Sequence, residues 1–522
     1  MAASLGVDPA VEPEAFARYF SGDVDSFPES QRPWATPYAV SVFGQPIPSP
    51  DPFGRGNAYG DGRACSLGEF VNGDGERWEL QLKGSGTTPF SRRGDGRAVL
   101  RSSVREYLVS EAMEAMGVPT TRALCLVTSK TQYTQRMWYA AADLGRREHP
   151  PDTLISERCA ITCRAAPSFI RVGHIELWAR RATKGEAGAE ARLSALLEHA
   201  LKREFPEVDP GAPLRQRLFG MLRSFADRQA KLAIAWVRVG YVQGNMNSDN
   251  CLLSGRTMDY GPFGFVEDYE PLWSPFTSDM ERKFGFERQP LAAQVNVMTL
   301  ARALLSMFVA LDGDQRAAAE LQAIVNDEYP ALLSAQLGEM RRRKLGLKAW
   351  DDATRDGLWE RLHSLMEEAK PDYTVFWRQL AAFSEADIHA AAAAAEGAEG
   401  AEDDAARARL VATIAPAFEG GAAAVAGSWL EWLTEYAARL KADGRPAEER
   451  AAEMRATSPK YVPREWMLAE AYTAAEQGDH APLEELRVLF AAPFDEHPQY
   501  EERYYCRTPQ DQVQKGGISF MS

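Results

Sequence analysis

The stretch of sequence that decides the fold runs Gln243-Gly-Asn-Met-Asn-Ser-Asp-Asn250 and is followed by Asp259-Tyr-Gly261. Phosphotransferases of the kinase fold place an Asp, then an Asn five residues later, then an Asp-Phe-Gly-like triplet. This chain keeps that frame, because Asn250 lies at the offset of the metal-binding Asn and Asp259 opens the triplet. The pattern predicts that these two residues hold a metal ion on the phosphates of a nucleotide.

The position of the acceptor-orienting Asp in this frame is occupied by Asn245. An amide cannot accept a proton as a carboxylate does, so ordinary phosphoryl transfer to a hydroxyl is disfavoured. Asp249 supplies a carboxylate at a shifted position. The alternative interpretation is a polar turn without catalysis, because Asn and Asp are favoured in turns.

A strand and a helix upstream of this loop match the layout of a kinase small lobe. Trp78-Glu-Leu-Gln-Leu-Lys83 alternates apolar and polar residues, which predicts a half-buried strand ending at Lys83. We expect a helix over residues 103–116, with Ser103 and Glu106 as a capping box. In a kinase the strand Lys neutralises phosphates and a helix Glu fixes it. The alternative is that Lys83 is a solvated strand residue and Glu106 only a cap.

Glycine-rich turns and two arginines add candidate phosphate contacts. The turns are Gly60-Asp-Gly-Arg63, Gly84-Ser-Gly86 and Gly94-Asp-Gly-Arg97, and glycine lets the backbone approach a phosphate closely. Each such motif is more often a plain hairpin turn, and none is a Walker A loop. Arg164 and Arg171 lie seven residues apart and could clamp a polyphosphate, although surface arginines are commoner.

The pattern along the chain predicts an α+β, protein-kinase-like bilobal fold. The expected parts are an N-terminal lead-in (1–54) that packs on the body, a strand-rich small lobe (55–165), a helical large lobe with the catalytic loop (166–389), an Ala-rich linker (390–407) and a helical C-terminal extension (408–522). The clearest single element is a helix over residues 214–239, ended by Gly240.

Composition narrows the function classes. Acidic residues outnumber basic residues 74 to 59 over 522 residues, and the formal net charge of -15 argues against binding to nucleic acid or anionic membrane. We find no run of about 18 apolar residues and no signal or transit pattern near Met1. Six cysteines are too few for a disulfide scaffold. A monomer in a reducing, cytoplasmic compartment is the expectation.

Taken together, these segments resemble the selenoprotein O family of kinase-fold protein adenylyltransferases. The resemblance covers most of residues 55–505, with weaker similarity at Ser458-Pro-Lys-Tyr-Val462 and Ala475-Glu-Gln-Gly-Asp479. The stronger matches are Gly60-Asp-Gly-Arg-Ala64, Leu80-Gln-Leu-Lys-Gly-Ser-Gly86, Ser91-Arg-Arg-Gly-Asp-Gly-Arg-Ala-Val-Leu-Arg-Ser-Ser-Val-Arg-Glu106, Gly117-Val-Pro-Thr-Thr-Arg-Ala123, Asn245-Met-Asn-Ser-Asp-Asn250 and Asp259-Tyr-Gly-Pro-Phe-Gly264.

The resemblance implies transfer of AMP from ATP to a Ser, Thr or Tyr hydroxyl of protein substrates, with Mg²⁺, or alternatively Mn²⁺, as the metal. The family binds ATP inverted relative to ordinary kinases, which would explain the loss of the kinase Asp at Asn245. The resemblance also implies a mitochondrial location as an alternative to the cytoplasm. By motif match, Asp249 falls on the proton acceptor and Asn250 and Asp259 on the metal ligands. The ATP contacts fall on Gly60, Gly62, Arg63, Lys83 with its partner Glu106, Asp95, Gly96, Arg164, Arg171 and Asp259.

The chain departs from the family pattern at two places. Many family members have His-Gly before the catalytic loop, where this chain has Gln243-Gly244. Many members carry a Cys or selenocysteine two residues before the terminus, but this chain ends Gly517-Ile-Ser-Phe-Met-Ser522 and its last cysteine is Cys506. We therefore do not expect redox control through a C-terminal thiol.

Two alternative functions remain open at the sequence level. A kinase-fold phosphotransferase is disfavoured by Asn245. A nucleotide-binding pseudoenzyme that acts as a scaffold is disfavoured by the joint presence of Lys83, Asp249, Asn250 and Asp259.

Overall fold

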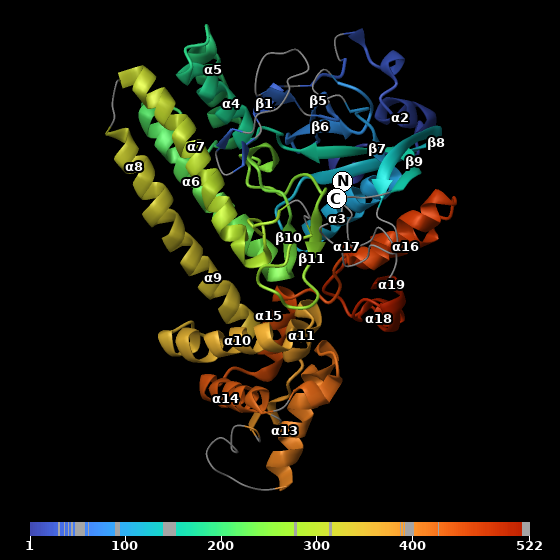
Figure 1. The fold of residues 1–522 in the computed structure, drawn as a ribbon, viewed down its shortest axis with the longest axis vertical. Helices are drawn as coiled ribbons and strands as arrows, with labels where there is room; N and C mark the ends of the chain where they lie inside the picture. The colour runs from blue at the N-terminus through green and yellow to red at the C-terminus, as the bar shows by residue number, and fades with distance from the viewer. Residues whose placement is uncertain are drawn as a thin grey trace.

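The computed structural model describes residues 1–29, 32–35, 37–39, 41–42, 45–46, 58–60, 62–88, 94–138, 153–275, 279–312, 316–386, 388–389, 391, 401–425 and 427–513. Asp61 of the first glycine turn, residues 91–93, the centre of the expected linker and the C-terminal tail from 514 lie outside these ranges. The chain folds into a strand-rich N-terminal part and a helical remainder (Figure 1). This is the mixed, kinase-like architecture expected from the sequence.

The N-terminal part is built on one antiparallel sheet. Its strands follow the order β5 (Ala64–Val71), β6 (Arg77–Lys83), β9 (Thr153–Ala166) and β7 (Ala98–Val99), and β8 (Arg122–Trp138) pairs with β9. Helix α3 (Leu100–Ala115) packs on β8 and β9. The strand expected from Thr121 to Val127 is therefore correct in type but continues as a long hairpin arm to Trp138.

The N-terminal lead-in covers the outer side of this sheet. Helices α1 (Ala2–Leu5) and α2 (Pro13–Phe20) bring Leu5 and Phe20 into one apolar cluster with Leu80 and Leu82 of β6. Within this segment β2 (Ser41–Val42) pairs with β3 (Gln45–Pro46), and β1 (Pro37–Ala39) pairs with β4 (Ala58–Gly60), which follows the lead-in. Helices α1 and α2 therefore pack on the sheet.

Long helices form the large lobe. They are α4 (Val172–Thr183), α5 (Ala189–Glu204), α6 (Leu214–Val239), α7 (Gln289–Asp312), α8 (Ala317–Ala323) and α9 (Tyr329–Leu345). Helix α6 has the predicted bounds, and Gly240 ends it in the left-handed conformation with φ of 77°. The segment between α6 and α7 carries the hairpin of β10 (Tyr241–Gln243) and β11 (Phe263–Phe265), which frames the candidate site.

One helical segment in this lobe is apolar enough to resemble a membrane span. By length and composition alone Phe286–Val309 could cross a bilayer, but 61% of its most apolar window is buried inside the fold. Val297, Leu300 and Leu304 of this segment belong to the main apolar core. The composition is that of a core helix.

The C-terminal helices extend the large lobe and then return to the small lobe. Helices α10 (Glu360–Ala369), α11 (Tyr373–Leu380), α13 (Ala401–Ile414), α14 (Ser428–Asp443) and α15 (Ala447–Thr457) lie at the far end of the molecule (Figure 1). Helices α16 (Glu465–Glu476) and α17 (Ala481–Ala491) pack on α3, with α18 (Pro498–Tyr504) and α19 (Gln510–Val513) beside them. Residues 401–407, expected in the linker, form the start of α13.

The capping box predicted for α3 is wrong. The helix begins at Leu100, its N-cap is Val99 without a side-chain cap, and Ser103 is buried inside the helix. The physical reason is that the Glu106 carboxylate binds Lys83 and Arg164. It therefore does not accept a hydrogen bond from a backbone N–H at the start of the helix.

Candidate active site

Lys83 and Glu106 form a buried ion pair at the centre of the site. Strand β6 ends with Lys83, whose Nζ lies 2.6 Å from Oε2 of Glu106 on α3. The two side chains are only 8% and 3% exposed. The kinase-like pairing expected from the sequence is therefore present, and the alternatives of a solvated lysine and a capping glutamate are wrong.

Arg164 joins this pair from the neighbouring strand. Its Nη1 lies 3.5 Å from Oε1 of Glu106, and its Nη2 donates to Oε1 of Gln81. Gln81 lies directly opposite Arg164 in the β6–β9 register, on the same face of β6 as Lys83. Sequence reasoning missed Gln81, although its spacing of two residues from Lys83 was a usable signal.

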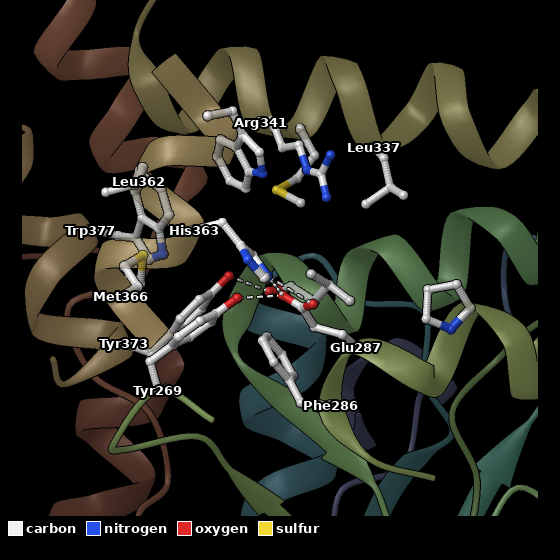
Figure 2. A pocket seen from close by; sticks show the side chains of 14 residues that line it. Tyr269, Phe286, Glu287, Leu337, Arg341, Leu362, His363, Met366, Tyr373 and Trp377 are labelled. Atoms are coloured by element: carbon white, nitrogen blue, oxygen red, sulfur yellow. Dashed lines mark hydrogen bonds and ion pairs between the residues drawn. The ribbon is translucent and has the colours of Figure 1, made fainter. Parts of the chain in front are cut away.

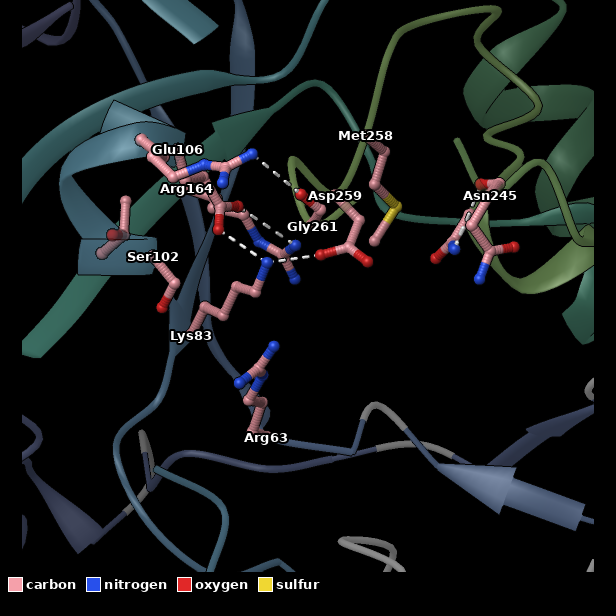
Figure 3. A network of polar contacts seen from close by, with 12 residues as sticks. Arg63, Lys83, Ser102, Glu106, Arg164, Asn245, Met258, Asp259 and Gly261 are labelled. Atoms are coloured by element: carbon pink, nitrogen blue, oxygen red, sulfur yellow. Dashed lines mark hydrogen bonds and ion pairs between the residues drawn. The ribbon is translucent and has the colours of Figure 1, made fainter. Parts of the chain in front are cut away.

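Asp259 faces this cluster from the other lobe (Figure 3). Its carboxylate accepts a hydrogen bond from Lys83 and forms an ion pair with it. Lys83 therefore bridges the carboxylates of Glu106 and Asp259. Burial opposes ionisation of Asp259, but Lys83 and Arg164 outweigh it and hold the pKa of this carboxyl well below its usual range. Its φ of 63° is left-handed, a strained conformation that tends to cluster at functional sites.

The loop of residues 244–250 is held by its own amides. Oδ1 of Asn245 accepts from the Asn247 N–H at 3.1 Å, and Nδ2 of Asn250 donates to the Asn245 carbonyl at 3.4 Å. Asn245 thus shapes a turn. Asn250 uses its nitrogen within the loop, which leaves Oδ1 as its atom for a cation. Asp249 lies in the short 3₁₀ turn Ser248–Asn250 and is buried.

Two glutamines attach this loop to Asp259 and to the large lobe. Nε2 of Gln243 donates to the carbonyls of Met258 and Asp259 at 3.1 and 3.3 Å. The Gln289 side chain accepts from the Gln243 N–H and donates to the Tyr241 carbonyl, both at 2.8 Å. Gln243, one of the departures from the family pattern, therefore fixes the backbone that presents Asp259.

Helix α4 supports the other end of the loop. Ser248 Oγ donates to a carboxylate oxygen of Glu176, which is 5% exposed. The backbone of Val172 donates to the Cys251 carbonyl at 2.9 Å, so the N-cap residue Arg171 lies beside the end of the loop. Glu176 had no recognisable sequence signal, because its partner lies 72 positions away.

Arg105, one residue before Glu106, ties the triplet to α3. Its Nη2 lies 3.5 Å from the Gly261 carbonyl and 3.4 Å from the Phe263 carbonyl, and its Nη1 lies 3.2 Å from Glu465 of α16. The C-terminal helices therefore brace the helix that carries Glu106. This contact, too, was missed from the sequence.

A cavity of about 710 Å³ lies beside this cluster on the small lobe. Arg63 lines it and also lowers the pKa of Asp259 electrostatically, which connects the cavity to the Lys83 cluster (Figure 3). The volume is in the range of small-molecule sites. The lining residues are Gly62, Arg63, Gly94, Asp95, Gly96, Arg97, Tyr133, Thr134, Gln135 and Arg136.

The structure thus gathers four of the expected ATP contacts, Gly62, Arg63, Asp95 and Gly96, in one cavity. Asp95 is fixed by Thr134 Oγ1 at 2.6 Å and Arg136 at 3.0 Å. Burial opposes its ionisation, but these hydrogen bonds prevail and lower the pKa of Asp95. Gly60 ends β4, one residue before the undescribed Asp61.

Comparison with known proteins gives the family. A sequence model described as "Protein adenylyltransferase SelO" matches residues 1–490. The chain belongs to the SelO family. Similar relatives include proteins named "Protein nucleotidyltransferase YdiU" from Azoarcus sp., 38% identical over all of this chain and 90% of the relative, and from Methylobacillus flagellatus, 37% identical over 94% and 85%. A further one, from Xanthomonas campestris, is 38% identical over 97% and 87%.

The donor set of this SelO-family site suits magnesium. Asp259 offers a carboxylate and Asn250 an amide oxygen, and Mg²⁺ is usually held by one or two such ligands plus phosphates and water. Within the described ranges no cluster of three His, Cys, Asp or Glu residues could hold a metal on its own.

Proposed function

We propose that this SelO-family protein transfers AMP from ATP to a hydroxyl of protein substrates. The observation that carries the proposal is the contrast between two positions in one loop. Asn245, in the frame position of the kinase Asp, is an amide engaged in a turn, whereas Asp249 provides a buried carboxylate next to Asn250. Lys83, to which we assign phosphate binding, contacts both Glu106 and Asp259, which supports the proposal. The carboxylate at Asp249 is displaced from the position of the kinase base. This displacement fits a nucleotide that presents its α-phosphate, and not its γ-phosphate, to the acceptor.

The chemistry we propose divides among the residues as follows. Asp249 takes the proton from the acceptor hydroxyl. The hydroxyl oxygen forms a bond to the α-phosphorus of ATP, and the bond from that phosphorus to pyrophosphate breaks. Lys83, kept in place by Glu106, and Arg164 stabilise the charge on the leaving pyrophosphate. Arg63 lies at the mouth of the nucleotide cavity, where it can contact the phosphates.

The remaining expected contacts support this assignment. Gly62 and Gly96 let the backbone approach the nucleotide, and Arg171, at the N-cap of α4, lies where the catalytic loop ends. Asn250 and Asp259 would hold magnesium, which neutralises phosphate charge when bound. We propose the cytoplasm as the compartment, because the six cysteines, all within the described ranges, form no disulfide.

A phosphotransferase of the same fold is the second candidate, favoured by the intact Lys83–Glu106 pair. Intact-mass analysis of a protein acceptor incubated with ATP and Mg²⁺ separates the two. Addition of an AMP group, lost in Asp259→Ala, is the expected result. Addition of a single phosphoryl group would replace our proposal with the second candidate, and no modification of any acceptor or of the chain itself would favour a scaffold.

A further inference from the structure

A second, smaller cavity lies where the large lobe meets the C-terminal helices (Figure 2), and Lys83 is not among its lining residues. It measures about 90 Å³ and is bounded by α9 on one side and by α10 and α11 on another. Its walls are mainly apolar, with aliphatic and aromatic side chains, which favours the apolar part of a ligand. The aromatic wall residues are Tyr269, Phe286, Trp359, Tyr373 and Trp377.

The one acidic residue in the wall, Glu287, is already compensated. His363 Nε2 lies 3.1 and 3.2 Å from its two carboxylate oxygens, and the Tyr269 hydroxyl donates to one of them. Burial opposes ionisation of Glu287, but the hydrogen bonds from His363 and Tyr269 lower its pKa. The same contact raises the pKa of His363. The Glu287 carboxylate is therefore hydrogen-bonded by its neighbours, and it does not need a cationic ligand to compensate its charge.

Arg341 is the charge in this cavity whose hydrogen-bond donors are not matched, although the carboxylates of Glu287 and Glu360 attract it electrostatically. Its guanidinium lies 4.7 Å from the centre of the Trp359 ring and reaches into the cavity from α9 (Figure 2). Among the described residues it has no hydrogen bond or ion pair, and its Nε is buried without an acceptor. The indole N–H of Trp359, itself 8% exposed, is likewise buried without an acceptor. Buried donors of this kind are normally satisfied.

We propose that this cavity binds a small carboxylate with a short apolar body. A guanidinium presents paired N–H donors that match a carboxylate, and the aromatic walls accept the apolar part. The volume equals that of about three water molecules, which limits the ligand to roughly four non-hydrogen atoms, the size of acetate. Arg341 and the His363 side chain disfavour a cation. The proposal does not depend on the AMP-transfer activity.

The test uses acetate as the probe and the full-length protein, with binding measured by calorimetry in buffer without competing carboxylates. Arg341→Met keeps an unbranched side chain of similar length and removes the guanidinium. The matched control is Arg343→Met on the same helix, whose guanidinium lies 3.7 Å from Glu453 and outside this cavity. We expect wild type and Arg343→Met to bind acetate equally, and Arg341→Met at least about tenfold more weakly.

Three outcomes would overturn the proposal. The first is absence of acetate binding to the wild type, and the second is equal binding of acetate by Arg341→Met. The third is equal or tighter binding of a competitor: sulfate would indicate an anion site without an apolar requirement, and tetramethylammonium would indicate a cation site. Should Arg341→Met unfold, Arg341→Lys keeps the charge without the paired donors. Its affinity should fall between those of wild type and Met, and undiminished affinity would contradict the role of the guanidinium fork.

Discussion

Gly96 offers a quantitative test of the proposed nucleotide cavity, because a side chain at this position has no room. A Cβ added at Gly96 would lie 1.9 Å from the Gly86 carbonyl oxygen and 2.7 Å from the Thr87 nitrogen. Both neighbours are backbone atoms, and the Gly86 N–H donates to the Gly96 carbonyl at 3.2 Å. Gly96→Ala must therefore separate the two segments and break that hydrogen bond.

The expected cost has three parts. Alanine at φ of 66° costs about 1–2 kcal/mol, the lost hydrogen bond about 1 kcal/mol, and the overpacking about 1–3 kcal/mol. The local stability of the turn should fall by about 3–6 kcal/mol. Because Asp95 and Gly96 line the cavity, kcat/KM for ATP should fall about 10- to 100-fold.

Gly75→Ala is the matched control for this substitution. Gly75 has a similar φ of 79° in a turn of the same sheet, but nothing lies within 4 Å of an added Cβ. It should show only the backbone strain of about 1–2 kcal/mol and normal kinetics with ATP. Amide hydrogen exchange of the peptide that contains Gly86, with ATP kinetics in parallel, measures both effects. Equal behaviour of the two variants would refute the close approach of Gly96 to Gly86.

Three further predictions concern the charged groups. Asp249→Asn should lower AMP transfer about 10²- to 10⁴-fold with ATP affinity nearly unchanged, and adding Asn245→Asp should not rescue it; rescue would place the base at 245. Glu106→Gln should lower kcat at least about tenfold in a transfer assay, whereas Glu111→Gln on the same helix should not, and equal losses would deny Glu106 a special role. His363 has a raised pKa in the folded protein, so its stabilisation is full below about pH 6.5 and is lost as pH rises through the folded pKa. His363→Gln should therefore flatten the fall in unfolding free energy as the pH rises above about 6.5, and an unchanged slope would contradict this.

Local sequence patterns predicted correctly those features that depend on a single helix or on two neighbouring elements. Helix α6 was predicted from its apolar spacing and from Gly240, because both act within a few residues. Lys83 and Glu106 could be paired because a strand end and a following helix have a known order in kinase small lobes. The cap proposed for Ser103 failed because the Glu106 carboxylate is held by long-range partners that no local pattern reports.

The residues that were missed share one physical property. Glu176 supports Ser248 from 72 positions away, and Arg105 meets Glu465 from 360 positions away. Such contacts depend on how helices α4 and α16 pack, which is set by the whole core. They hold the loop and the triplet in place, so the positions of Asp249 and Asp259 follow from the fold as much as from their own motif.

The central claim is that AMP, not phosphate, is transferred, and parallel incubations with α-labelled and γ-labelled ATP test it most directly. We predict that label stays on protein only from the α position, in the wild type and, at a comparable rate, in Asn245→Asp, because Asp at 245 can still accept the hydrogen bond from Asn247. Label retained from the γ position, especially strong transfer by Asn245→Asp, would show that the nucleotide lies in the ordinary kinase orientation and would contradict the account.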